Sequence, residues 1–92
     1  MIVRILGEDQ YEVPSSYLDR LNRLDNQAVL AAAEGDSKKF QRFLGQMLEL
    51  VRKRGRRLPP EELHESDVIL PFPDLTIEEA KGLFVGEGLI PG

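Results

Sequence analysis

The side chains that could support catalysis or metal binding are few, and they form no recognised set. His64, the only histidine, lies in the segment EELHESD beside Glu61, Glu62, Glu65 and Asp67. An imidazole among carboxylates suits a metal ion, but such sites usually recruit further histidines or cysteines at a fixed spacing. The chain has one histidine and no cysteine. We therefore interpret His64 as a surface histidine and predict neither a metal ligand nor a cofactor.

Nucleophilic and phosphate-binding chemistry is equally poorly supported. Most of the serines, which are Ser15, Ser16, Ser37 and Ser66, stand where helix caps are expected, and no second histidine can serve as a base with an orienting partner. The C-terminal segment GEGLIPG, residues 86–92, has glycines like those of a phosphate-binding loop. It is predicted to follow a helix, however, and no helix remains after it to receive a phosphate. We predict that the protein is not an enzyme.

Charge is divided along the chain into three blocks. The net charge of −4 combines −4 in residues 1–37, +7 in residues 38–57 and −7 in residues 58–92. The basic block ends in VRKRGRRLPP, residues 51–60, although the chain as a whole is acidic. The acidic C-terminal block could fold back on the basic block and neutralise it, which weakens a nucleic-acid-binding interpretation.

The basic run has a structural explanation for about half of its members. Arg52, Lys53 and Arg54 are expected in the last turn of a helix, where cations meet the negative end of the helix dipole. Gly55 is expected as a left-handed cap residue. Arg56 and Arg57 lie beyond this cap and have no such explanation. The candidate partner-binding surface therefore comprises Lys38, Lys39, Arg42, Arg52, Lys53, Arg54, Arg56 and Arg57.

Hydrophobic spacing predicts the N-terminal elements that position these residues. The segments IVRIL, residues 2–6, and QYEV, residues 10–13, predict the two strands of a β-hairpin. Ser16 and Asp19 then have the spacing of a capping box at the start of a helix, and Gly35 is a natural stop for that helix.

A second helix is predicted to follow at once. Asp36 can cap it, and Phe40, Leu44, Met47 and Val51 belong to an apolar stripe of period three to four. Because only Gly35 and Asp36 separate the two helices, we expect an antiparallel helical hairpin.

The C-terminal third predicts one more strand and one more helix. The segment DVILP, residues 67–71, suits a short buried strand, and Thr76 with Glu79 has capping-box spacing. We therefore predict an α+β fold: a small antiparallel sheet, made of the N-terminal β-hairpin and a third short strand, packed on an antiparallel helical hairpin, with a C-terminal helix.

Chain length and composition bound the remaining possibilities. The 92 residues suit one domain, residues 1–92. No apolar run is long enough to span a bilayer, the first residues lack the pattern of a signal peptide, and cysteine is absent. We therefore expect a cytoplasmic protein. An exposed hairpin edge could pair with a second copy, which leaves a homodimer open.

Two classes of partner follow from the residues alone. The favoured class is a charged protein, which the basic helix would steer and orient, with Leu50, Leu75 and residues 89–90 as candidates for apolar contact. The alternative is a small nucleic-acid-associated regulatory protein that uses the basic helix 38–57 to track phosphates. The net negative charge and the two-residue link between the helices disfavour this alternative.

Three segments resemble a known family. The opening MIVRILGEDQYEVP, the segment LPPEELHESDVILPFPDLTIEEAKGLF and the ending GEGLIPG resemble PspAA, the small proteins associated with phage shock protein A. The resemblance implies a non-catalytic accessory protein that binds or regulates a PspA-like coiled-coil protein in the bacterial envelope-stress response. It also implies indirect association with an anionic membrane, at its inner face, through that partner. No functional residues are carried over from the family.

Overall fold

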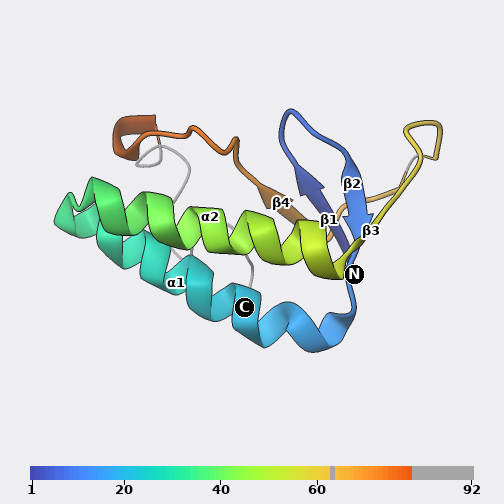
Figure 1. The fold of residues 1–92 in the computed structure, drawn as a ribbon, viewed down its shortest axis with the longest axis horizontal. Coiled ribbons are helices and arrows are strands. Elements are labelled where there is room, and N and C mark those ends of the chain that lie inside the picture. Colours follow the sequence, from blue (N-terminus) through green and yellow to red (C-terminus); the bar gives the residue numbers. More distant parts are fainter. Residues whose placement is uncertain (63, 80–92) are drawn as a thin grey trace.

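The fold combines a four-stranded sheet with two long helices. The structure is a computed structural model and describes residues 1–62 and 64–79. Strands β1 (Ile2–Ile5) and β2 (Gln10–Glu12) form the predicted antiparallel hairpin. Strand β3 (Arg56–Arg57) pairs with β2, and β4 (Val68–Leu70) pairs with β1, which gives the order β3-β2-β1-β4 (Figure 1). The predicted α+β fold class is confirmed.

The sheet is mixed, whereas the sequence predicted an antiparallel one. The third strand was expected at residues 67–71, and β4 does lie there, but it runs parallel to β1, with Val3 opposite Val68 and Ile5 opposite Leu70. The chain reaches β4 by a long connection from β3, so a tight antiparallel turn is not required. Strand β3 was not expected, and it adds the fourth strand at the edge of the hairpin.

The two helices form the predicted hairpin. A short 3-10 turn, η1 (Ser15–Tyr17), precedes α1 (Leu18–Glu34), and α2 (Ser37–Arg54) follows. Gly35 ends α1 with a φ of 73°, and the Asp36 side chain accepts a hydrogen bond of 3.0 Å from the Lys39 amide. Both features confirm the sequence prediction.

Two predicted helix ends differ from the structure. No capping box forms between Ser16 and Asp19, because Ser16 lies in η1 and α1 begins without a side-chain cap. Gly55 is extended, with φ −93° and ψ 158°, rather than left-handed. At Gly55 the chain passes directly from α2 into β3, so the backbone adopts strand geometry at once. The expected capping box at Thr76 does form with Glu79 and opens a helical segment at residues 77–79.

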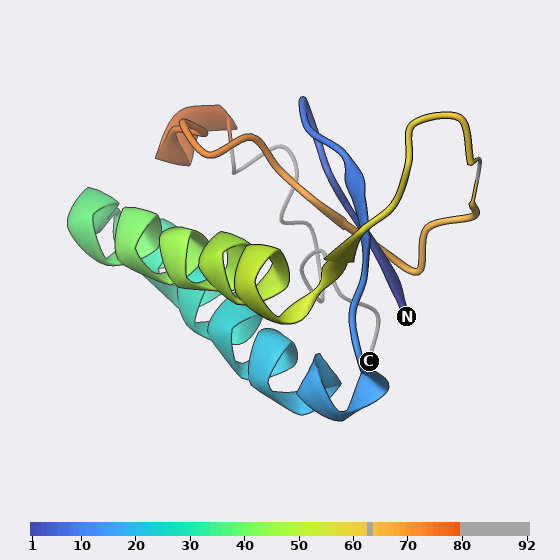
Figure 2. The same ribbon diagram turned by 45° about the vertical axis from the view of Figure 1, so that its right-hand side comes forward.

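The core lies between one face of the sheet and the helical hairpin. Figures 1 and 2 show α1 and α2 side by side, with the sheet against the end where α1 begins and α2 ends. Alternation along β1 and β4 buries Val3 and Leu70 and exposes Arg4 and Ile69. The buried side chains that fill this space include Ile5, Val13, Leu21, Ala28, Phe40, Leu44, Met47 and Val51.

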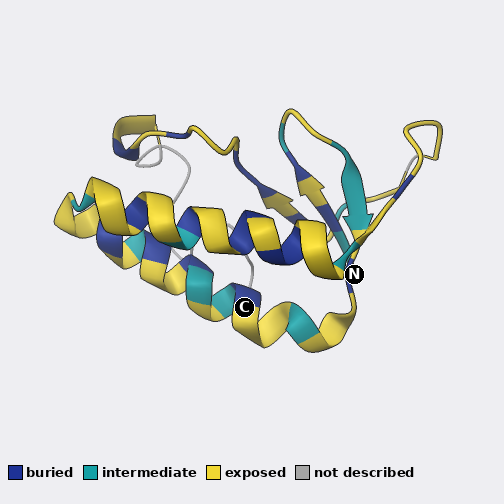
Figure 3. Ribbon diagram, in the orientation of Figure 1, coloured by how far each residue is buried: buried dark blue, intermediate teal, exposed yellow. Residues whose placement is uncertain are grey.

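The helices turn their polar sides outward, and Figure 3 shows an exposed strip along α2. One charged side chain lies inside instead: Asp25 on α1 is fully buried. None of the described helices is long and apolar enough to cross a membrane.

A candidate partner-binding surface on the helical hairpin

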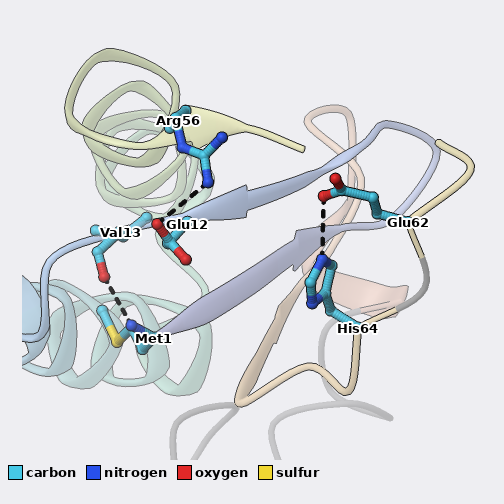
Figure 4. Close-up of polar contacts among 6 residues, drawn as sticks. All are labelled: Met1, Glu12, Val13, Arg56, Glu62 and His64. Carbon is cyan, nitrogen blue, oxygen red and sulfur yellow. Dashed lines mark hydrogen bonds and ion pairs between the residues drawn. The ribbon is translucent and has the colours of Figure 1, made fainter. Parts of the chain in front are cut away.

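Three of the eight predicted surface cations contact the N-terminal β-hairpin. Their partners are the carboxylates of the turn and of β2: Arg57 lies 2.7 Å from Asp9, Arg56 lies 3.4 Å from Glu12 (Figure 4), and Arg52 pairs with Glu8. We refer to Arg52, Arg56 and Arg57 as the hairpin arginines and to Glu8, Asp9 and Glu12 as the hairpin carboxylates.

Strand pairing places two of these arginines. Arg56 stands opposite Glu12 in the register of β2 and β3, and Arg57 stands opposite Tyr11. Opposite charges on facing residues of an antiparallel pair stabilise the pairing. The two arginines that the predicted helix cap could not explain are therefore a short edge strand.

Arg52 joins the helix to the same hairpin. It leaves the last turn of α2 and reaches Glu8 in the β1–β2 turn through two guanidinium nitrogens. Arginine is charged throughout the physiological range, and the hydrogen bond with the Glu8 carboxylate raises the pKa of Arg52 further above its ordinary value. This bidentate contact links α2 to the sheet.

Three of the four described ion pairs of the basic block therefore involve the N-terminal hairpin, and the fourth lies within α2. The sequence left open whether the acidic C-terminal block folds back on residues 38–57; its described part, residues 58–62 and 64–79, forms no ion pair with them. Residues 80–92 lie outside the described part of the chain.

The other five cations lie along α2. Lys53 pairs with Glu49 one turn earlier at 2.6 Å and lowers the pKa of Glu49. The Arg42 guanidinium lies 4.9 Å from the centroid of the Phe43 ring, a cation–π contact. Lys38, Lys39 and Arg54 are exposed and have no ion-pair partner within the described residues.

The eight cations therefore do not make one patch. Helix α2 has 18 residues, which span about 27 Å at 1.5 Å per residue. Lys38, Lys39 and Arg42 lie at one end of this span, and the remaining five lie at the other. The hairpin arginines interrupt any continuous basic stripe, because three carboxylates neutralise them.

An apolar contact site near these cations was only partly foreseen from the sequence. Leu50 and Leu75 were suggested as contacts, but both are largely buried, and residues 89–90 lie outside the described part of the chain. Leu30 on α1 is instead 61% exposed. Leu30 lies outside the apolar row of α1 that faces the core. This position off the row is the sequence signal that could have identified it.

The chemistry expected of His64 is limited. Its ring lies 3.3 Å from Glu62 (Figure 4), a contact between two partly exposed side chains. Within residues 1–62 and 64–79, no group of three histidine, cysteine or acidic side chains converges as metal ligands would. The absence of metal, cofactor and catalysis stays a prediction.

Comparison with known proteins assigns the family. The family model described as PspA-Associated protein, PspAA, matches residues 1–92, which is the whole sequence. No curated protein and no solved structure matches the chain. The family match agrees with the resemblance carried by the two ends of the sequence and by its segment around β4. The chain therefore belongs to the PspA-associated family, PspAA.

Proposed function

We propose that the chain is a non-catalytic accessory protein that binds a PspA-like coiled-coil protein and regulates it in the bacterial envelope-stress response. The observation that carries this proposal is the family match over residues 1–92, since the family is described by its association with PspA. Any association of the chain with the inner face of the membrane would then follow from this partner.

The charges of the helical hairpin support an electrostatic contribution to binding. Lys38, Lys39, Arg42 and Arg54 have no carboxylate partner within the described residues, and Lys53 pairs only within its own helix. We propose these five as the main charged part of the partner surface. The hairpin arginines, which belong to the originally predicted set, contribute less because their carboxylate partners neutralise them.

Co-purification tests the proposal directly. The tagged chain would be expressed with the PspA-like protein of its own genome, and the eluate would be run on a sizing column at about 50 mM and about 500 mM salt. We expect a complex that is weaker at high salt. The absence of a complex at both salt concentrations would refute the proposal. Nucleic acid in the eluate in place of the complex would favour the nucleic-acid alternative.

A charge-matched pair of variants then tests the surface. The double variant Lys38→Glu with Arg42→Glu reverses two neighbouring cations of α2, and Arg4→Glu with Arg23→Glu makes the same charge change at exposed positions on β1 and α1. We expect the first to weaken the complex about tenfold at low salt, and the second to change it by less than about threefold. Equal effects would show that only net charge matters.

A further inference from the structure

Two neighbouring hollows follow one side of the junction between α1 and α2. The first, of about 310 Å³, has Leu24 and Leu50 in its lining. The second, of about 240 Å³, has Leu30, Ala31 and Phe43 in its lining. We refer to the two hollows together as the α1–α2 seam.

The spacing of the lining residues shows that the hollows share one side of the helical hairpin. On α1 they include Arg20, Leu24, Gln27, Ala31 and Glu34, which are three or four positions apart. Residues at this spacing lie along a single side of a helix. On α2 the same spacing joins residues 39, 43, 46, 50 and 53. The two hollows therefore lie in line along the same side of both helices.

The buried core lies on a different side of the same helices. The most deeply buried residues of α2 are Phe40, Leu44, Met47 and Val51, which are offset by about 100° from the seam row. Within the described residues, the seam is lined by α1 and α2 alone. Leu30, one of its apolar side chains, remains 61% exposed.

The rim of the seam is basic although the molecule is acidic. Five cations line the two hollows, and only Glu34 and Glu49 oppose them, so the lining carries +3 in a chain of −4. The lining cations are Arg20, Lys39, Arg42, Lys53 and Arg54. Contact with Phe43 holds Arg42 at this rim. Charge complementarity therefore favours an acidic binding partner in the seam.

The shape of the seam fits a helix. Two antiparallel helices of 17 and 18 residues border it, so a third helix of about 16–18 residues could lie along its length of about 25 Å. Such a helix would place apolar residues at every third or fourth position against Leu24 and Leu30, and over the largely buried Leu50 in the floor of the first hollow. A second copy of this chain does not fit equally well, because two seams facing each other would bring +3 against +3.

We propose that the α1–α2 seam binds an amphipathic α-helix with acidic flanks. This inference deepens the proposed function and rests on it for the source of the helix, a segment of the PspA-like protein. The seam's own chemistry can be tested without that protein.

The test uses two synthetic helical peptides of about 18 residues. Both carry leucines at the spacing of one helix side, and their flanking positions are glutamate in one peptide and lysine in the other. Methyl NMR of the full chain reports where each peptide binds. We expect the glutamate peptide, and not the lysine peptide, to shift the signals of Leu24, Leu30 and Leu50.

A matched pair of variants completes the test. Leu30→Glu places an acid in the seam, and Ile69→Glu places one on β4, where Ile69 is 47% exposed. Because both leave the core intact, circular dichroism should show native helix content in each. We expect Leu30→Glu to weaken binding of the glutamate peptide about tenfold or more, and Ile69→Glu to leave it unchanged.

The outcomes separate this inference from the proposed function. Peptide binding at the seam without a PspA complex would retain the seam and remove the proposed function. A PspA complex that Leu30→Glu leaves intact, with no peptide binding, would retain the function and overturn the seam. Equal binding of both peptides would overturn the seam inference. So would a concentration-dependent dimer that Leu30→Glu abolishes, which would assign the groove to a second copy.

Discussion

Removing the hairpin carboxylates tests whether the hairpin arginines hold the fold together or face the partner. The variant carries Glu8→Gln, Asp9→Asn and Glu12→Gln, which keep side-chain size and remove charge. Each lost pair is a surface pair: the arginine side chains are 40–69% exposed and the carboxylates 30–55%. Pairs of this kind contribute about 0.2–1 kcal/mol each. We therefore expect the free energy of unfolding to fall by about 1–2 kcal/mol.

This loss should be visible in both chemical and thermal unfolding. For a domain of this size, 1 kcal/mol corresponds to about 4–8 °C in Tm, so Tm should fall by about 4–16 °C. Urea unfolding at about 50 mM and about 500 mM salt gives the free energies, and the difference from the wild type should shrink at high salt because surface charges are screened.

A charge-matched control makes the result specific. Glu61→Gln, Glu65→Gln and Glu78→Gln change the net charge equally at exposed positions that have no ion pair within the described residues. We expect this control to leave the stability within about 0.5 kcal/mol of the wild type. Equal destabilisation by the two triple variants would refute the assignment of the hairpin arginines to structural pairs.

Partner binding supplies a second readout from the same variant. If the hairpin arginines are internal contacts, removing their carboxylates should leave the affinity for the PspA-like protein within about twofold of the wild type. If they face the partner, the freed arginines should bind it more tightly. Tighter binding, absent from the control, would therefore return these arginines to the partner surface.

Three further predictions concern the helices. Gly55→Ala should lower the free energy of unfolding in urea by about 1–3 kcal/mol, because its Cβ would lie 2.5 Å from the Val51 carbonyl oxygen. Gly35→Asn, at φ 73° with open space around it, should lower it by less than about 0.5 kcal/mol. Asp36→Ala should cost about 1 kcal/mol in thermal unfolding, because it removes the cap of α2; an unchanged Tm would contradict this role. Because Lys53 lowers the pKa of Glu49 below 4.5, their pair stabilises the fold above that pH and loses its effect as the pH falls through the lowered value. Lys53→Gln should therefore flatten the decline of stability between neutral pH and about pH 3, and parallel profiles would count against the pair.

The sequence predicted those elements whose pattern is local. Asp36 and Thr76 cap helices in the structure as their spacing indicates, and the apolar rows around Phe40 and Val3 are buried as predicted. In each case the signal and the interaction lie within a few residues of each other. Local spacing is therefore sufficient to place the hairpin, the helices and their link.

The features that could not be predicted depend on segments far apart in the chain. A strand of two arginines has no hydrophobic period, and it exists because β2 pairs with it about 45 residues away in sequence. The parallel direction of β4 likewise follows from the path of the connection. Asp25 lies on the apolar row of α1, one turn from Leu21, but a charged side chain is ordinarily expected at the surface, and its full burial was not predicted.

The candidate site shows the same division, and helix geometry explains it. Consecutive residues of an α-helix differ by about 100° in direction. The cations of one run therefore point to different sides of the helix and cannot all contact the same partner. Arg52 contacts the N-terminal β-hairpin, whereas its neighbours Lys53 and Arg54 line the seam. The order of charged residues in the sequence thus says little about which charges are available for binding. A scan that reverses the whole run would combine loss of the hairpin contacts with loss of the partner surface, and only variants chosen by side of the helix can separate them.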